Sequence, residues 1–382
     1  MEHRAREAIR PRLSLSVGQV VYLDLVRAFA AGLVLIDHIH WLTGAPTRVL
    51  GIAPGTLGVT VFFLVSGFLI DRSVHGHKAD YGLREFLIER ASRIYVCFVP
   101  ALVFTAVLVS ALVDSPDFVG GPHTGAWQFI GNLLMLQGYP AFQLARRAGL
   151  DSPWFVQPYA LAEPYWTIPI ELFLYVAFGV AFFVLVKRTA KLTTPLTAAL
   201  AVAALPVLYH AATGWGECLS LVWLLGVLGS RWFHRQEQNG QRTGSILVLM
   251  AVAAVLLGLR LLSRGGEFYD LQKALFLGVL LLGGLQLSAR AEWLAARIVR
   301  VPAAFFANTS YALYLTHNVI VGWAVMHFGK QLSLVQLSAV IVACQLCAWT
   351  FWWMFDRHHK RVATWLKETT LQSEPTPDLS QS

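Results

Sequence analysis

The chain has 382 residues, of which 56% are hydrophobic and 14% charged, and its mean hydropathy is +0.56. This is more apolar surface than a soluble core needs, which excludes an ordinary soluble domain. The net charge of +8 does not indicate nucleic-acid binding, because a basic protein with many membrane spans owes its excess charge to cytoplasmic loops. Composition therefore predicts an all-α, polytopic protein in contact with the lipid bilayer.

Ten apolar runs are long enough to predict membrane-spanning helices. We place them near residues 21–42, 57–71, 93–113, 164–186, 194–213, 217–233, 244–262, 271–288, 303–327 and 334–355. A shorter segment, 126–137, is predicted to be interfacial or re-entrant. The expected organisation is a basic N-terminal segment (1–20), a membrane domain (21–355) and a tail (356–382) that is disordered towards its end.

Positive charge is distributed unevenly between the two sides of this topology. With the N-terminus inside, 23 of the 30 Lys and Arg residues fall on the cytoplasmic side, which predicts that both termini are cytoplasmic. The long connection 114–163, rich in Pro, Gly and aromatic residues, is the expected outer lid over the substrate. All four cysteines lie in apolar runs, so neither a disulfide framework nor a metal site is predicted.

The first span carries ionisable residues that are costly in a membrane, roughly 2.5–3.5 kcal/mol each at mid-depth, and this indicates function. Arg27 and His38 are separated by ten residues, which returns them to within about 20° of one helix face, about 16 Å apart along the axis. One interpretation is a charged entrance with an imidazole near mid-membrane. The alternative is an Arg that snorkels to the headgroups and a His that is merely packed.

The second and third spans add a small-residue pair and an arginine pair. Ser66 and Gly67 are predicted to let another helix approach closely. Arg90 and Arg93 lie one helical turn apart at the cytoplasmic mouth of the third span, where two guanidinium groups suit a phosphate. Ordinary positive-inside usage is the alternative explanation.

Polar residues recur in the fourth and ninth predicted spans. Pro169 frees the carbonyl of Tyr165, which predicts a distorted outer turn with Glu171 just inside it. A carboxylate there needs a partner, and His38 is the candidate, which would make a general-base pair. Backbone amides or Trp166 are the alternative partners for Glu171.

In the ninth span, Ser310, Tyr314 and His317 share one face. For Ser310 and Tyr314, hydrogen bonds that hold helices together explain this placement. For His317 the role is open.

Six motifs together resemble the membrane-bound acyltransferase-3 family, which acylates surface polysaccharides and other glycans. They are LDLVRAFAAGLVLIDH, GVTVFFLVSGFLI, FLIERASRIY, NLLML, EPYWTIPIELFLY and SYALYLTH, in this order. No single motif is specific, but the set extends from about Asp24 to about Trp353.

The resemblance assigns roles to individual residues. The family's Arg and His signature, with ten residues between, falls on Arg27 and His38, and its paired arginines fall on Arg90 and Arg93. The family's Trp-Ser-Leu-Ser-x-Glu is WTIPIE in this chain, so Pro169 replaces the second Ser and the role of Glu171 is less certain than that of His38.

The resemblance implies an O-acyltransferase in a bacterial inner membrane that uses acetyl-CoA or another acyl-CoA and no metal. In this hypothesis Arg27, Arg90 and Arg93 bind the CoA phosphates. His38 acts as general base or as a transient acyl carrier, with Glu171 assisting. Ser66, Trp166, Tyr314 and His317 are candidates for contacts with the glycan acceptor or the oxyanion.

The rival hypothesis is a transporter or flippase, whose intramembrane charges line a path rather than take part in chemistry. Against it, the hydropathy pattern has no inverted repeat, and paired arginines at one mouth suit a phosphorylated donor. The sequence specifies neither the acceptor nor an oligomeric state.

Overall fold

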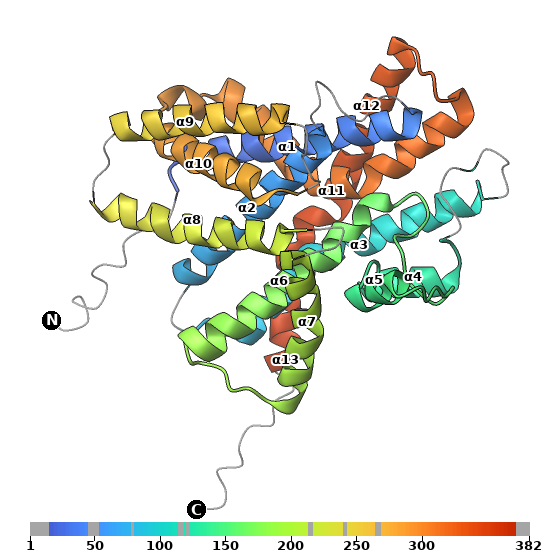
Figure 1. The fold of residues 1–382 in the computed structure, drawn as a ribbon, viewed down its shortest axis with the longest axis horizontal. Coiled ribbons are helices and arrows are strands. Elements are labelled where there is room, and N and C mark those ends of the chain that lie inside the picture. The colour runs from blue at the N-terminus through green and yellow to red at the C-terminus, as the bar shows by residue number, and fades with distance from the viewer. Residues whose placement is uncertain are drawn as a thin grey trace, which may run out of the picture.

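The computed structural model describes residues 15–44, 53–77, 80–113, 118, 123–212, 217–239, 243–263 and 269–371, and these residues contain helices and no strand. The helices are α1 (Val17–Thr43), α2 (Pro54–Gly76), α3 (Leu83–Ser110), α4 (Ala126–Leu133), α5 (Pro140–Arg147), η1 (Glu163–Trp166), α6 (Thr167–Val180), η2 (Ala181–Val186), α7 (Thr194–Ala212), α8 (Leu219–Asn239), α9 (Thr243–Leu262), α10 (Leu271–Ser288), η3 (Glu292–Ala295), α11 (Arg297–Phe328), α12 (Leu334–Met354), η4 (Asp356–His358) and α13 (His359–Leu371). Figure 1 shows α8, α9 and α10 grouped at one side of the molecule and the short α4 and α5 at another.

Eight helical stretches within the described residues are long and apolar enough to cross a membrane. The prediction of an all-α polytopic protein is confirmed, although eight is fewer than the ten spans predicted. The two remaining predicted spans correspond to α8 and α11. These helices are 21 and 32 residues long, but polar residues lower their mean hydropathy. In α11 these polar residues are buried against other helices, among them Thr309, Thr316 and Asn318.

Helix α1 lies in the middle of the bundle and packs against α2, α10 and α11. A capping box fixes its start: the Ser16 hydroxyl accepts a hydrogen bond from the Gln19 N–H at 3.3 Å, and the Gln19 side chain accepts one from the Ser16 N–H at 2.8 Å. The helix ends at Thr43 and is capped by Gly44, which has a left-handed backbone conformation with φ of 71°. Because of this cap, α1 begins at Val17 rather than at the predicted residue 21.

Glycines allow α2 and α8 to pack backbone against backbone. A Cβ atom on Gly67 would lie 2.0 Å from the carbonyl oxygen of Trp223, and one on Gly226 would lie 2.2 Å from that of Leu64. The predicted close approach of a helix at Gly67 is confirmed, and its partner is α8.

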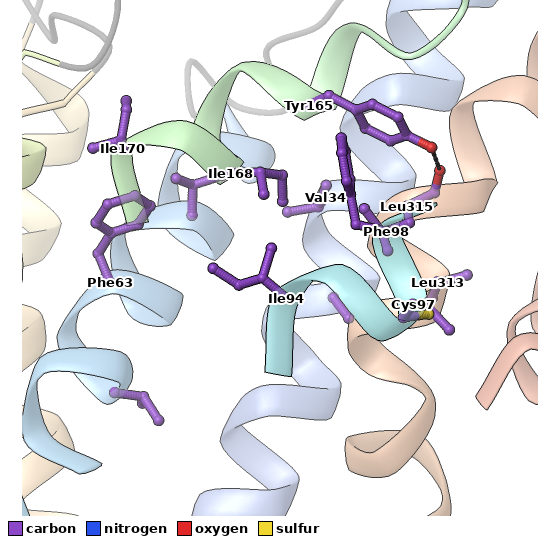
Figure 2. Close-up of a cluster of buried hydrophobic side chains, with 14 of the residues drawn as sticks. Val34, Phe63, Ile94, Cys97, Phe98, Tyr165, Ile168, Ile170, Leu313 and Leu315 are labelled. Atoms are coloured by element: carbon purple, nitrogen blue, oxygen red, sulfur yellow. Dashed lines mark hydrogen bonds between the residues drawn. The ribbon is translucent and has the colours of Figure 1, made fainter. Parts of the chain in front are cut away.

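The region around Pro169 has the predicted distortion. The residues before it form the 3₁₀ turn η1, and the Tyr165 carbonyl accepts a hydrogen bond from the Gln137 side chain at 3.3 Å. The Tyr165 hydroxyl donates to the carbonyl of Leu315 at 3.0 Å (Figure 2). Figure 2 also shows Phe98 of α3 beside this ring, with the ring centroids 5.2 Å apart, so η1 is held in the hydrophobic core between α3 and α11.

The connection before η1 contains α4 and α5, each eight residues long and therefore too short to span. Buried Asn132 holds the two sides of this connection together. Its amide group donates to the carbonyls of Gln128 and Gln157, both at 2.8 Å, and its carbonyl accepts from the Tyr159 N–H at 3.2 Å.

The segment after α12 is ordered and packs on the bundle. Helix α13 lies against α3 and continues to Leu371, so the first part of the predicted tail 356–382 is helical. The remainder of that tail, 372–382, lies outside the described residues, as does most of the basic N-terminal segment.

Candidate active site

A cavity of about 500 Å³ opens between α1, α2, α3, α6, α11 and the segment after α12. Its polar wall includes Arg27, Ser66, Arg90, Arg93, Thr167, Glu171, Tyr175, Ser310, Tyr314, Arg357, His359 and Lys360. Helices that are distant in the sequence therefore bring six predicted site residues and several unpredicted ones into one space.

Arg27 enters this cavity from α1. Its guanidinium lies 3.9 Å from the Asp24 carboxylate, one helical turn away, and donates to the Ser310 hydroxyl at 3.4 Å. Ser310 in turn donates to the Ala307 carbonyl at 2.7 Å. Ser310 was predicted to form a hydrogen bond between helices, and its partner is Arg27 of α1.

Arg90 and Arg93 both line the cavity, but neither stands apart from acidic residues. Arg90 lies 3.6 Å from Glu89, and Arg93 forms a close ion pair with Asp356. Asp356 is only 3% exposed and is held by the turn that follows α12. The two arginines are therefore not the independent pair that the sequence suggested, and a phosphate at Arg93 has to share the guanidinium with Asp356.

Glu171 points its carboxylate at hydroxyl groups. Ser66 donates to it at 2.8 Å, and the Tyr175 hydroxyl donates to the same oxygen. The Trp223 indole in turn donates to the Ser66 oxygen at 3.2 Å, so α2, α6 and α8 all meet at this point. The expectation that Glu171 orients His38 is wrong in this structure, because these hydroxyls satisfy the carboxylate instead.

His38 faces another imidazole. Its ring lies against that of His317 with the centroids 4.9 Å apart in an edge-to-face arrangement. The Nδ1 atoms contact the carbonyls of Val34 and Leu313 at 2.9 and 2.8 Å. A carbonyl only accepts, so each Nδ1 carries the proton and each Nε2 carries the lone pair. The Nε2 atom of His317 is buried and has no hydrogen-bond partner in the described structure.

Tyr314 lines the cavity and also lies beside one of these imidazoles. Its ring lines the cavity opposite Phe62, at a centroid distance of 6.4 Å, and lies 6.2 Å from the His317 ring. Its hydroxyl donates to the Pro164 carbonyl at 2.7 Å and lies 2.6 Å from the Thr167 hydroxyl. His38 itself is not part of the cavity wall.

Comparison with known proteins gives one family. Residues 20–355 match the model of the acyltransferase domain of the acyltransferase-3 family. The chain belongs to the acyltransferase-3 family. It is also similar to an O-acetyl transferase of Shigella phage Sf6, with 28% identity over 162 residues. That match covers 41% of this chain and 44% of the relative, less than half of each. No solved structure matches the chain.

In this acyltransferase-3 protein, the sequence did not identify several polar groups in the cavity wall, among them Tyr175, Asp356, Arg357 and Lys360. Tyr175 lies four residues after Glu171, so helical spacing was an available signal. The other three follow the last span, where basic residues such as Arg357 and Lys360 are expected for topology alone. Only the packing of α13 on α3 brings this segment to the cavity.

Trp166 lies outside the large cavity. Its ring packs against Tyr269, with the centroids 5.7 Å apart, just before α10. Burial raises the pKa of Tyr269 well above its ordinary value, and the proximity of Tyr314 and Asp37 raises it further. Tyr269 therefore stays neutral and connects Trp166 to the region around Tyr314.

Across the described ranges, no three His, Cys, Asp or Glu residues are grouped so that they can hold a metal ion. The four cysteines are free thiols.

Proposed function

We propose that this integral membrane protein transfers an acyl group, most simply acetyl, from cytoplasmic acyl-CoA to a hydroxyl of a glycan or glycan-like acceptor. The observation that carries the proposal is a single cavity whose wall combines three arginines with a carboxylate and several hydroxyl groups. The phage relative is described as an O-acetyl transferase, which supports acetyl and a hydroxyl acceptor. The proposed location is a bacterial cytoplasmic membrane.

Arg27, Arg90 and Arg93 are the proposed phosphate ligands. Guanidinium groups bind phosphates through charge-assisted, often bidentate hydrogen bonds. Their side chains are 21–26% exposed, so a ligand can reach them although each is mostly covered by its neighbours. Binding there directs the rest of the donor towards Ser66, Glu171 and Tyr314.

Contacts between loops support the cytoplasmic side for the arginines. Three polar contacts join segments that the charge count places inside: Arg72 with Glu237 at 3.3 Å, Lys187 with the Tyr81 carbonyl, and Lys367 with Glu89 at 2.6 Å. Segments that are all predicted to be cytoplasmic therefore contact one another, as they should if the predicted topology is correct.

His38 is the proposed general base. Its Nε2 lone pair takes the proton of the acceptor hydroxyl while the hydroxyl oxygen attacks the thioester carbon, forming the ester C–O bond. The C–S bond then breaks, and the proton passes to the departing CoA thiolate. In this proposal the His317 ring, which lies edge-to-face against His38 with the centroids 4.9 Å apart, holds the His38 ring in position.

His38 is not part of the cavity wall, whereas Tyr314 lines the cavity and lies beside His317, so the proposed transfer requires the Tyr314 ring to move aside. Its hydroxyl, held by Thr167 and Pro164, is then available with Ser66 to donate to the oxyanion of the tetrahedral intermediate. Glu171 keeps Ser66 and Tyr175 oriented at the same end of the cavity.

The test uses purified protein, labelled acetyl-CoA and a panel of glycan acceptors. Wild type should transfer label, and His38→Gln should lose about 10²–10⁴-fold in rate, because an amide cannot take up a proton near neutral pH. Membrane abundance and affinity for CoA should not change.

Three outcomes of that test contradict the proposal. If His38→Gln transfers label as fast as wild type, the base is elsewhere. If wild type retains label on His38 without acceptor, His38 is an acyl carrier. If wild type transfers no label to any acceptor but moves glycans across vesicles, the flippase hypothesis replaces the enzyme.

A further inference from the structure

The segment after α12 contributes two basic side chains to the cavity wall, Arg357 and Lys360. Both are exposed, whereas Arg27, Arg90 and Arg93 are largely covered. The cavity therefore has an inner group of three arginines and an outer pair of cations nearer to solvent.

The inner and outer cations differ in their partners. Within the part of the chain that the structure describes, Asp24, Glu89 and Asp356 lie within ion-pair distance of Arg27, Arg90 and Arg93 in turn. Arg357 contacts the Trp353 ring, at 4.7 Å, and His358, at 3.1 Å.

The described ion pairs leave both Arg357 and Lys360 without an acidic partner, although both border a cavity. The positive charges of Arg357 and Lys360 are therefore available to bind an anion in the cavity.

Two ion pairs fix this segment in place. Asp356, directly before Arg357, pairs with Arg93 of α3, and Lys367, two turns into α13, pairs with Glu89 of α3 at 2.6 Å. Arg357 and Lys360 lie between these two anchors, within about one helical turn of Asp356. Their backbones are thus held against α3, which limits the entropy lost when they bind a ligand.

We infer that Arg357 and Lys360 bind the 3′-phosphate of CoA, while the inner arginines bind its diphosphate. This inference rests on the proposed function. Along CoA, the thioester is followed by the pantetheine arm, then the diphosphate, and then the ribose with its 3′-phosphate. A donor whose thioester lies at the Ser66 and Tyr314 end of the cavity therefore presents its 3′-phosphate to the outermost cations.

The experiment measures binding directly, with purified protein in nanodiscs and calorimetry with CoA and with dephospho-CoA, which lacks only the 3′-phosphate. In wild type, CoA should bind more tightly than dephospho-CoA. In the Arg357→Ala and Lys360→Ala double variant, the CoA affinity should fall roughly fivefold to tenfold, because each exposed charge pair contributes modestly. Its affinity for dephospho-CoA should stay as in wild type.

Arg361→Ala is the matched control, since Arg361 is an exposed cation next to Lys360 that does not line the cavity. It should bind both ligands like wild type. If Arg361→Ala weakens CoA binding as much as the double variant does, the cations act only through general surface charge, and the inference fails.

Two further outcomes separate this inference from the proposed function. If wild type binds CoA and the double variant binds it equally well, the inference fails and the proposed function remains. If wild type binds neither CoA nor dephospho-CoA, acyl-CoA is not the donor, and both this inference and the proposed function are wrong.

Discussion

At the scale of single residues, the candidate site depends on polar groups whose partners come from other helices. Arg93 illustrates this, since its carboxylate partner Asp356 lies 263 residues later in the chain and is almost fully buried. Removing one member of a buried ion pair leaves the other charge without compensation, which usually costs more than the pair contributes. Arg93 therefore has two separable roles, one in stability and one in donor binding.

These roles predict different behaviour for Arg90 and Arg93. Arg90→Ala should weaken CoA binding with little change in thermal stability. Arg93→Ala should weaken CoA binding and also lower the free energy of unfolding by up to about 3 kcal/mol, the low end of the range because Arg93 is partly exposed. Calorimetry and thermal unfolding in detergent measure the two effects.

The double variant Arg93→Ala with Asp356→Ala is the control for this prediction. It should recover most of the lost stability, because no buried charge is left unpaired, but it should not recover CoA binding. Recovery of CoA binding in the double variant would show that Arg93 does not contact the donor.

At the scale of elements, close contacts between helices position the Ser66 and Glu171 cluster. Ser66 precedes Gly67 on α2, where the α2 backbone meets the backbone of α8 at Trp223. Trp223 also donates to Ser66. Gly67, which allows α8 to pack closely, therefore also sets the distance between the Trp223 indole and the Ser66 hydroxyl.

Gly67→Ala should destabilise the protein, because its Cβ would lie 2.0 Å from a backbone oxygen that cannot rotate away. The expected cost is about 1–3 kcal/mol, typical of overpacking, with lower activity because the Ser66 contact is displaced. Gly32→Ala on α1 is the control, since a Cβ there meets no atom within 4 Å. Equal unfolding temperatures for the two variants would contradict this account of α2 and α8.

At the scale of the whole molecule, the direction of the chain in the membrane decides which end of the cavity meets cytoplasmic CoA. The basic segments contact one another at one end of the bundle, through Arg72, Lys187 and Lys367. On the predicted outer side, Arg260 near the end of α9 pairs at 2.5 Å with Asp270, in the connection that follows this helix.

Fusions to a reporter that is active only outside the cytoplasm test this orientation. A fusion after Asp151, in the exposed connection between α5 and η1, should be active. One after Arg235, near the end of α8, should be inactive. The reverse pattern would place the arginines of the cavity on the side without CoA and would contradict the proposed donor path.

The sequence by itself determined the class of fold and most of the helices, because apolar runs of membrane-spanning length have few alternative structures in lipid. It also identified Arg27, Ser66, Arg90, Arg93, Glu171 and Tyr314, which the structure places in one cavity wall, since charged and polar residues are rare in such runs. Spacing along one helix predicted a shared face for Arg27 and His38 but did not reveal which residues each of them contacts.

Only the tertiary structure decided the partners. Glu171 bonds Ser66 and Tyr175, while His38 packs against His317, because the angles and offsets between helices are set by packing that no single helix encodes. The same holds for Asp356, Arg357 and Lys360. In sequence they belong to a mostly basic tail after the last span. They become part of the cavity because α13 folds back onto α3, through ion pairs between residues that are hundreds of positions apart in the chain.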